Sequence, residues 1–207
     1  SNLIITCCQT GIGTAERIKN LLEDSLPKSL DVKIISYDYR DLMDEEKITS
    51  LKKSFNILAV IGTAEVDIIG IPYIGLEDLI SENKTYLLKE VIQKINSQVD
   101  IEKINANILR NFSLERVLNS LTILDVQTVM KNIDTMMIEY ERISGGKLCN
   151  QTKMALYVHV SCLIERLIRR EEIQTYPDEN LFLNSEANQI LSNLKFALSV
   201  IEKMYSV

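Results

Sequence analysis

The sequence has no tryptophan, one histidine, three prolines and seven glycines among its 207 residues. A single histidine excludes any metal site that needs two, which covers most catalytic zinc arrangements. No apolar run approaches the roughly 18–20 residues that a membrane-spanning helix requires, and no signal peptide is recognisable. The four cysteines are too few for a disulfide framework in a chain of this length, so a reducing, cytoplasmic location is expected. We expect no metal and no cofactor.

What remains is the composition of an ordinary globular protein, with 46% hydrophobic and 25% charged residues. At roughly 100–200 residues per domain, the length allows one large domain or two small ones. The formal net charge of −6 gives the chain no electrostatic footprint for DNA or RNA. We therefore expect no direct nucleic-acid contact and no membrane contact.

The first half of the chain alternates between strand and helix patterns. Apolar runs at Leu3–Cys7 and Asn56–Ile61 and an alternating run at Val32–Tyr37 predict three strands. A fourth, Ile71–Ile74, is predicted at an edge because its proline cannot donate to a ladder. Thr14 is predicted to cap the first intervening helix. This order is typical of a small doubly wound α/β domain with a parallel sheet.

The second half of the chain has helical patterns only. Long amphipathic periods cover Asp125–Ile143, Gln151–Arg170 and Glu186–Met204. A glycine pair separates the first of these from the second. The chain is therefore predicted to contain an α/β domain over residues 1–98 and an all-α helical bundle over residues 99–207.

A glycine-bearing loop follows the first predicted strand. Backbone N–H groups and a helix N-terminus converge where a strand turns into a helix, which favours anions and a cysteine thiolate. No lysine precedes Lys19, which excludes a Walker loop, and Glu16 replaces the last glycine of a dinucleotide fingerprint. Thr14 stands where cysteine phosphatases carry an arginine, which favours holding or relaying phosphate over hydrolysis. The predicted phosphate-binding loop is Gln9, Thr10, Gly11, Ile12, Gly13 and Thr14, beside Cys8.

The residues also allow a structural interpretation, in which Cys7 and Cys8 are buried at the end of the strand and the glycines serve the turn. The stretch from Ile4 to Ala15 resembles the active-site loop of galactitol-type IIB components of the bacterial sugar phosphotransferase system (PTS). In that family the cysteine of Cys-x-x-Gly-x-x-Thr carries the phosphoryl group, which implies a phosphocysteine at Cys8. Free-standing IIB proteins usually have serine where this chain has Ala15.

The single histidine, His159, lies in a predicted helix. At 100° per residue, Arg166 and Arg170 fall within about 20° of it, where their guanidinium groups would stabilise a phosphoryl group on the ring. The alternative is a histidine at the border of core and solvent on an ordinary basic amphipathic helix.

This segment resembles the signature of a PRD, the PTS regulation domain, in which Leu-x-x-His-hydrophobic-x-x-x-x-Glu-Arg surrounds the phosphorylated histidine. Leu156, His159, Val160, Glu165 and Arg166 match it. A IIB-like domain followed by a PRD is similar to the C-terminal part of LevR-type regulators, which are sigma-54-dependent activators of sugar-utilisation genes. PRDs are five-helix bundles, so the resemblance implies that the last helix is lacking here.

The resemblance implies a regulatory fragment that senses PTS phosphorylation through His159, with Cys8 as a second phosphoacceptor. Its implied partners are the PTS phosphocarrier protein or a sugar-specific IIB, the upstream ATPase and DNA-binding domains of the same regulator, and a second copy bound through the PRD. Two other functions stay open: a IIB phosphotransferase that passes phosphate from Cys8 to a sugar, and a silent dimerisation or docking module.

Overall fold

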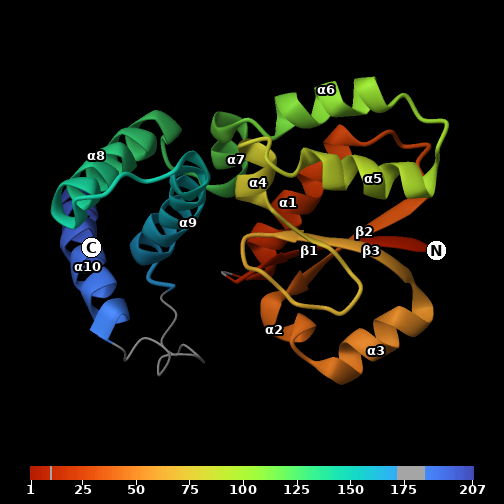
Figure 1. Ribbon diagram of the computed structural model, residues 1–207, viewed down its shortest axis with the longest axis horizontal. Coiled ribbons are helices and arrows are strands. Elements are labelled where there is room, and N and C mark those ends of the chain that lie inside the picture. Colours follow the sequence, from red (N-terminus) through yellow and green to blue (C-terminus); the bar gives the residue numbers. More distant parts are fainter. Residues whose placement is uncertain (10, 172–184) are drawn as a thin grey trace. The chain divides into compact units, whose positions relative to one another are not determined.

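The computed structural model describes residues 1–9, 11–171 and 185–207, with side chains from residue 189 onward in the last segment. The chain divides into two compact units, Ser1–Leu121 and Thr122–Val207. The first unit is α/β and the described part of the second is helical, which confirms the predicted fold class (Figure 1).

The first unit contains four strands, β1 (Asn2–Cys8), β2 (Val32–Asp38), β3 (Asn56–Gly62) and β4 (Tyr73–Gly75). They form one parallel sheet in the order β2-β1-β3-β4. β1 lies inside the sheet, and every residue from Leu3 to Cys8 is buried. A parallel strand that is covered on both faces has a continuous apolar sequence, which is why the pattern identifies it. Pro72, just before the edge strand β4, contributes its carbonyl to Val60 N–H at 2.9 Å.

Helices cover both faces of this sheet (Figure 1). One face carries α1 (Ile12–Ser25), α4 (Leu76–Ile80) and α5 (Thr85–Ile95). The other carries α2 (Tyr39–Leu42) and α3 (Glu45–Ser54). The arrangement is the doubly wound one that the alternation of strand and helix patterns predicts.

Side chains of β1 alternate between the two faces, as the period of a strand requires. Leu3, Ile5 and Cys7 belong to the core beneath α2 and α3. Thr6 faces the opposite side, where its hydroxyl donates to the carbonyl of Ala15 in α1 at 2.9 Å. The last residue of β1 therefore directs its side chain to the α1 side of the sheet.

Two further helices pack against α1, namely α6 (Ile101–Asn111) and α7 (Leu114–Leu121). Asn111 Nδ2 donates to Ser25 Oγ at 3.0 Å, and the Arg17 guanidinium donates to the Leu121 carbonyl at 2.5 Å. These bonds link α1 to the end of each helix. The first compact unit consequently runs past residue 98, where the sequence places the domain boundary. The assignment of residues 99–207 to a PRD stays a prediction.

The start of α1 differs from the predicted one. Gly11 is the N-cap, and the helix begins at Ile12. The φ of Gly11 is 122°, a value that residues with a side chain rarely adopt, and it lets the chain turn directly into the helix. Thr14 therefore lies inside the first turn, and the prediction that it caps the helix is wrong.

Two helices, α2 and α6, have no counterpart in the predicted pattern. α2 has four residues, which is too short for a periodic signal. α6 begins after Asp100, whose carboxylate accepts from Lys103 N–H at 3.1 Å. Ile104 and Ile108 face the core at helical spacing. The capping aspartate and this apolar pair are the signal in the sequence that identifies the helix.

The described part of the second unit contains three long helices, α8 (Val126–Ser144), α9 (Asn150–Ile168) and α10 (Ser185–Tyr205). α8 packs against both others. Asn132 Nδ2 of α8 donates to Tyr205 Oη of α10 at 2.9 Å, and Tyr157 Oη of α9 donates to Asp134 of α8. Gly145 ends α8 in the left-handed conformation, which confirms the predicted break. No helix among the described residues is long and apolar enough to cross a membrane.

One carboxylate holds the connection between α8 and α9. Glu141 accepts from the Leu148 N–H at 2.9 Å, from Lys147 Nζ at 3.0 Å and from Lys153 Nζ at 3.4 Å. The bond from Leu148, together with the nearby lysines, lowers the pKa of Glu141 to about 2. The carboxylate is therefore ionised throughout the physiological range and fixes the turn after α8.

Gly62→Ala is expected to destabilise the first unit by about 2 kcal/mol, because overpacking of this kind typically costs about 1–3 kcal/mol. A Cβ at this position would lie 2.3 Å from the Cys7 carbonyl oxygen and 2.7 Å from Cys7 Sγ. The measurement is the urea midpoint of unfolding. The matched control is Gly13→Ala, where a Cβ meets nothing within 4 Å and the helix gains a better former. Equal midpoints for the two variants would contradict the packing argument.

Candidate functional site

The first candidate site lies where the strand order reverses. From β1 the chain passes to β2 on one side and then returns to β3 on the other. In open α/β sheets, ligands bind outside the carboxyl ends of the strands at such a switch point. Cys8 is the last residue of β1, and Thr63 directly follows β3, so both lie at this point.

Cys8 is enclosed by its surroundings. Its exposed fraction is 1%, and that of Thr63 is 6%. The Thr63 hydroxyl donates to Cys8 Sγ across 3.0 Å. The Gly11 N–H donates to the Cys8 carbonyl at 3.3 Å, which closes the loop behind the thiol. The sulfur thus has a hydroxyl donor that comes from a strand far away in the sequence.

Cys7 faces the other side of the sheet and has a different environment. Its thiol is buried in the core beneath α2 and α3 and lies 3.9 Å from the Ala64 carbonyl oxygen. Burial, with a smaller contribution from neighbouring Cys8, raises the pKa of Cys7 to about 12. Cys7 therefore stays a neutral thiol at physiological pH, and its surroundings are those of a core residue.

The predicted phosphate-binding loop leads from Cys8 into the first turn of α1, and its role stays a prediction. Gly11 bonds to the Cys8 backbone, while Gln9, Ile12 and Gly13 are exposed. Thr14 is half-buried in the first turn of α1. Thr10, also predicted to belong to the loop, lies outside the described residues. Thr63 is the contact that sequence reasoning missed, because nothing in the chain near Cys8 signals a residue 55 positions away.

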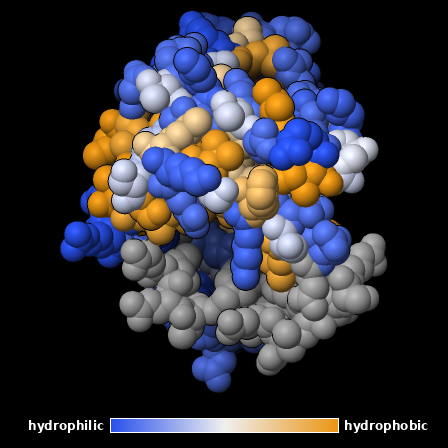
Figure 2. Space-filling model, turned by 90° about the vertical axis from the view of Figure 1, so that its left-hand side faces the viewer, coloured by the Kyte–Doolittle hydropathy of each residue, from blue (hydrophilic) through white to orange (hydrophobic). Residues whose placement is uncertain are grey.

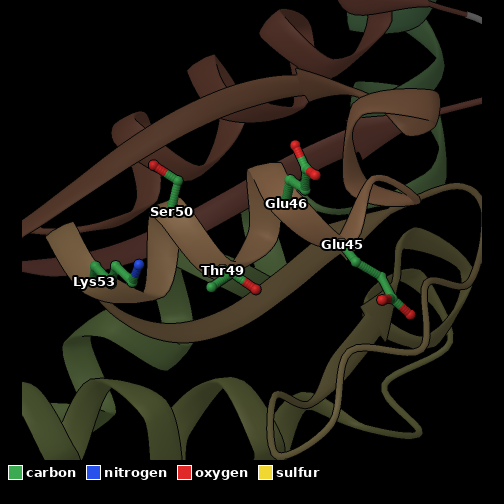
Figure 3. A pocket seen from close by; sticks show the side chains of 5 residues that line it. All are labelled: Glu45, Glu46, Thr49, Ser50 and Lys53. Atoms are coloured by element: carbon green, nitrogen blue, oxygen red, sulfur yellow. The ribbon is translucent and has the colours of Figure 1, made fainter.

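A surface hollow elsewhere in the first unit carries no comparable chemistry. Its lining comes from α3 alone, and the side chains spread along that helix instead of converging (Figure 3). The lining residues are Glu45, Glu46, Thr49, Ser50 and Lys53. Within the described residues, no three histidine, cysteine, aspartate or glutamate side chains are grouped to hold a metal ion.

The second candidate site is His159, which α9 presents on its exposed side. Its neighbours Val158 and Val160 are buried and fix the orientation of the helix. The protein around the ring partly desolvates it, which lowers the pKa of His159 below its ordinary value. At neutral pH the ring is therefore an unprotonated nucleophile at the protein surface.

The two predicted phosphate-supporting arginines occupy different environments. Arg166 lies on α9 two turns after His159, roughly 10 Å along the axis, and its Nε donates to the Glu171 carbonyl at 3.0 Å. α9 ends at Ile168, and Arg170 has a φ of 56°, outside the helix. The prediction that Arg170 shares the helical stripe of His159 is therefore wrong, because the helix ends two residues earlier. The supporting role of both arginines stays a prediction.

Glu165, which matches the PRD signature, has a structural position. Its side chain is buried, Oε2 accepts from Ile123 N–H at 3.0 Å, and Oε1 accepts from Arg169 Nη1 at 3.2 Å. These bonds connect the end of α9 to the segment that precedes α8. The four-residue spacing of Glu165 and Arg169 on a helix predicts their ion pair. The bond from Ile123 to Glu165 has no such signal in the sequence.

Fold and sites together define a two-unit protein with an enclosed thiol at the sheet's switch point and a surface histidine in the helical unit. Comparison with known proteins gives transcriptional regulators as its relatives. The chain is 25% identical to transcriptional regulatory protein DagR of Salmonella typhimurium over 213 aligned residues, covering 99% of this chain and 22% of DagR. It is 23% identical to transcriptional regulatory protein LevR of Bacillus subtilis over 179 aligned residues, covering 86% of this chain and 19% of LevR.

The chain thus spans about a fifth of the length of the curated relatives it matches. No family model matches the sequence, and no solved structure matches it.

The pKa of His159 is expected to lie below its ordinary value of 6.5 in the folded protein, because the surrounding protein partly desolvates the ring and so disfavours the imidazolium. A proton NMR titration measures it without ambiguity, since the chain has one histidine. The unfolded protein in urea is the control. The unfolded state then binds the proton more tightly than the folded state does. The free energy of unfolding is therefore unaffected by His159 above pH 6.5, and it decreases as the pH falls through the unfolded and then the folded pKa of His159. A pKa of His159 in the folded protein that equals or exceeds the pKa in the unfolded protein would contradict this prediction.

Cys149 is expected to react with iodoacetamide well before the other cysteines. It is exposed at the N-cap of α9, and a hydrogen bond with Thr152 Oγ1 at 3.1 Å lowers its pKa, whereas Cys7, Cys8 and Cys162 are buried. Peptide mapping by mass spectrometry measures the order of labelling. Thr152→Val should slow the reaction severalfold, and Thr152→Ser should restore it. Equal labelling of Cys8 and Cys149 would contradict the burial of Cys8.

Proposed function

We propose that the chain is the regulatory part of a transcriptional regulator of sugar-utilisation genes, and that it senses the phosphorylation state of the PTS through His159. The proposal is carried by the similarity to a transcriptional regulatory protein over 99% of the chain, in combination with a surface histidine in a PRD-like segment. The proposed donor is a phosphohistidine on the PTS phosphocarrier protein or a phosphorylated sugar-specific IIB.

The environment of His159 suits a phosphoacceptor. A neutral ring nitrogen attacks the phosphorus of the donor, so that a P–N bond forms on His159 while the donor's own bond to phosphorus breaks and its side chain leaves with the electron pair. The lowered pKa of His159 keeps the ring in the attacking form at neutral pH. Because the side chain is exposed, a donor protein reaches it without unfolding α9.

Phosphorylation would place negative charge at the middle of α9, about two turns before Arg166. Arg166 is the arginine on the same side of the helix, and it would exchange the Glu171 carbonyl for a phosphoryl oxygen. Arg170, just beyond the helix, is the second proposed support. The exchange would alter the end of α9, where Glu165 also contacts Ile123. A local charge change would thereby reach the packing of the helical unit.

We further propose that the regulator is a homodimer through its helical unit, with the ATPase and DNA-binding domains elsewhere in the same protein. Hydrophobic side chains remain at the surface of α8 and α10, among them Ile138, Ile190 and Phe196. Figure 2, which looks toward the helical unit, shows several groups of hydrophobic surface between hydrophilic ones. Surfaces of this kind favour a protein partner.

Cys8 is the proposed second phosphoacceptor. Its exposed fraction of 1% argues against the alternative of a IIB phosphotransferase, since a sugar must approach the phosphorus in line with the bond that breaks. A buried thiol gives no such approach without movement of the loop. The regulatory interpretation needs only that a protein donor opens the loop, or that Cys8 is silent.

The direct test is to incubate the chain with phosphoenolpyruvate, enzyme I, the phosphocarrier protein and sugar-specific IIB proteins. Mass spectrometry under conditions that preserve phosphoramidates then maps the label. We expect label on His159 in the wild type and in Cys8→Ser, and its loss in His159→Gln, a matched variant because the position is exposed. Label on Cys8 that passes to a sugar would establish the enzyme instead. Absence of label from both residues would overturn both phosphorylation proposals.

A further inference from the structure

We propose that Glu77 is a proton-dependent latch on the segment 63–72, which connects β3 to β4. With a neutral side chain Glu77 keeps this segment closed, and with an ionised side chain it loosens the segment. The inference goes beyond the proposed function, and it does not depend on phosphorylation of Cys8 or His159. It starts from the place of the Glu77 carboxyl group at the end of β4.

The Glu77 side chain folds back over the last residue of β4. A Cβ on Gly75 would lie 2.4 Å from Glu77 Oε1 and 2.9 Å from Oε2, so the carboxyl group fills the space that a side chain at position 75 would need. Gly75 pairs with Gly62 of β3, whose own open side is filled by Cys7 Sγ. By the alternation of a strand, Gly75 shares a face with Tyr73, which packs against the core beneath α2 and α3. The carboxyl group therefore lies on that side of the sheet, at its carboxyl end.

Two polar atoms at this place are buried and have no hydrogen-bond partner, namely Glu77 Oε2 and Tyr73 Oη. Burial, together with the charge of Glu77, raises the pKa of Tyr73, so the phenol is neutral. A buried neutral hydroxyl without a partner costs moderate free energy, whereas a buried carboxylate without a full set of partners costs considerably more. The folded structure thus accommodates a neutral Glu77 better than an ionised one.

The charges around Glu77 act in the same direction. Its pKa is raised, first by burial and then by the negative charges of Asp78 and Glu65. The backbone N–H of Glu77 and the charge of Lys84 act in the opposite direction and do not offset the increase. Lys84 Nζ lies 3.1 Å from Asp78 Oδ2, so its charge is directed mainly to that carboxylate. Glu77 therefore keeps its proton to a higher pH than an exposed glutamate does.

The segment 63–72 is the element that ionisation of Glu77 would loosen. Val66 and Ile68 anchor this segment in the core beneath α2 and α3. Glu65, directly before the anchor, carries a negative charge that opposes an ionised Glu77. When Glu77 releases its proton to solvent, this repulsion and the hydration of the new carboxylate both favour movement of the side chain out of its buried place. The segment begins at the switch point of the sheet, so the latch determines how firmly one side of that point is held.

The first measurement is the titration of Glu77 by NMR in the full chain, labelled with ¹³C at the carboxyl carbon of the glutamate side chains. We expect the Glu77 resonance, assigned with Glu77→Gln, to have a pH midpoint above the ordinary glutamate value of 4.5. Glu65→Gln removes one of the opposing charges and should lower this midpoint. A Glu77 midpoint at or below 4.5 would overturn the proposal, as would a midpoint that Glu65→Gln leaves unchanged or raises.

The second measurement is hydrogen exchange of the segment 63–72 by mass spectrometry, corrected for the pH dependence of the intrinsic rate. The stabilising contribution of neutral Glu77 is complete below the pKa of the unfolded chain and is lost as the pH rises through the folded pKa. In the wild type, protection of the segment should therefore fall about tenfold over this range, since a buried group without partners costs at least that much. Glu77→Gln, which is neutral at every pH, should keep its protection at pH 8.

Glu46→Gln is the matched control, because Glu46 also lies in the first turn of a helix but is exposed. This variant should lose protection in the segment as the wild type does. A wild type whose protection does not fall, or a Glu77→Gln variant that loses protection equally, would show that Glu77 is not a latch. If Glu77→Gln does not fold, as judged by circular dichroism, Glu65→Gln serves in its place and should retain protection to a higher pH than the wild type. The protein is unphosphorylated throughout, so neither result depends on the proposed function.

Discussion

The close approach of the carboxyl ends of β1 and β3 is the constraint on which the first unit depends. Gly62 leaves no room for a side chain against Cys7, so the two strands stay paired as far as Cys7 and Gly62. The same closeness delivers the Thr63 hydroxyl to Cys8 and sets the place where the loop leaves the sheet. A bulkier residue at position 62 would disturb the core, the switch point and the thiol together.

In the helical unit, two buried or nearly buried carboxylates hold the connections between the helices. Glu141 organises the turn between α8 and α9, and Glu165 ties the end of α9 to the segment before α8. Each carboxylate accepts from a backbone N–H and from a basic side chain, which satisfies it at low exposure. The connections are thus held by charge-assisted bonds, while His159 is left at the surface of α9. A histidine that is not needed for packing can accept a modification without loss of the fold.

Much of the architecture follows from the sequence, because buried positions require apolar residues and so give the sequence a recognisable apolar pattern. β1 and β3 are continuous apolar runs, and the amphipathic periods of α8 and α9 are long enough to be unambiguous. Short or irregular features leave no such trace. α2 is too short for periodicity, and the cap of α1 depends on the backbone angle of Gly11. The end of α9 is marked by the left-handed backbone of Arg170, which helical spacing does not predict. Arg170 consequently lies outside the helix that carries His159.

The sequence by itself determined the order of the α/β and helical regions, and it pointed to Cys8 and His159 as the two candidate nucleophiles. These are properties of residue type and local spacing, which can be read from the sequence without knowledge of the fold. Only the tertiary structure decided that Cys8 is enclosed and bonded to Thr63, that Arg166 is engaged at the end of α9, and that α6 and α7 belong with the α/β unit. Those facts depend on contacts between residues far apart in the chain, which are set by strand order and helix packing and have no local signature.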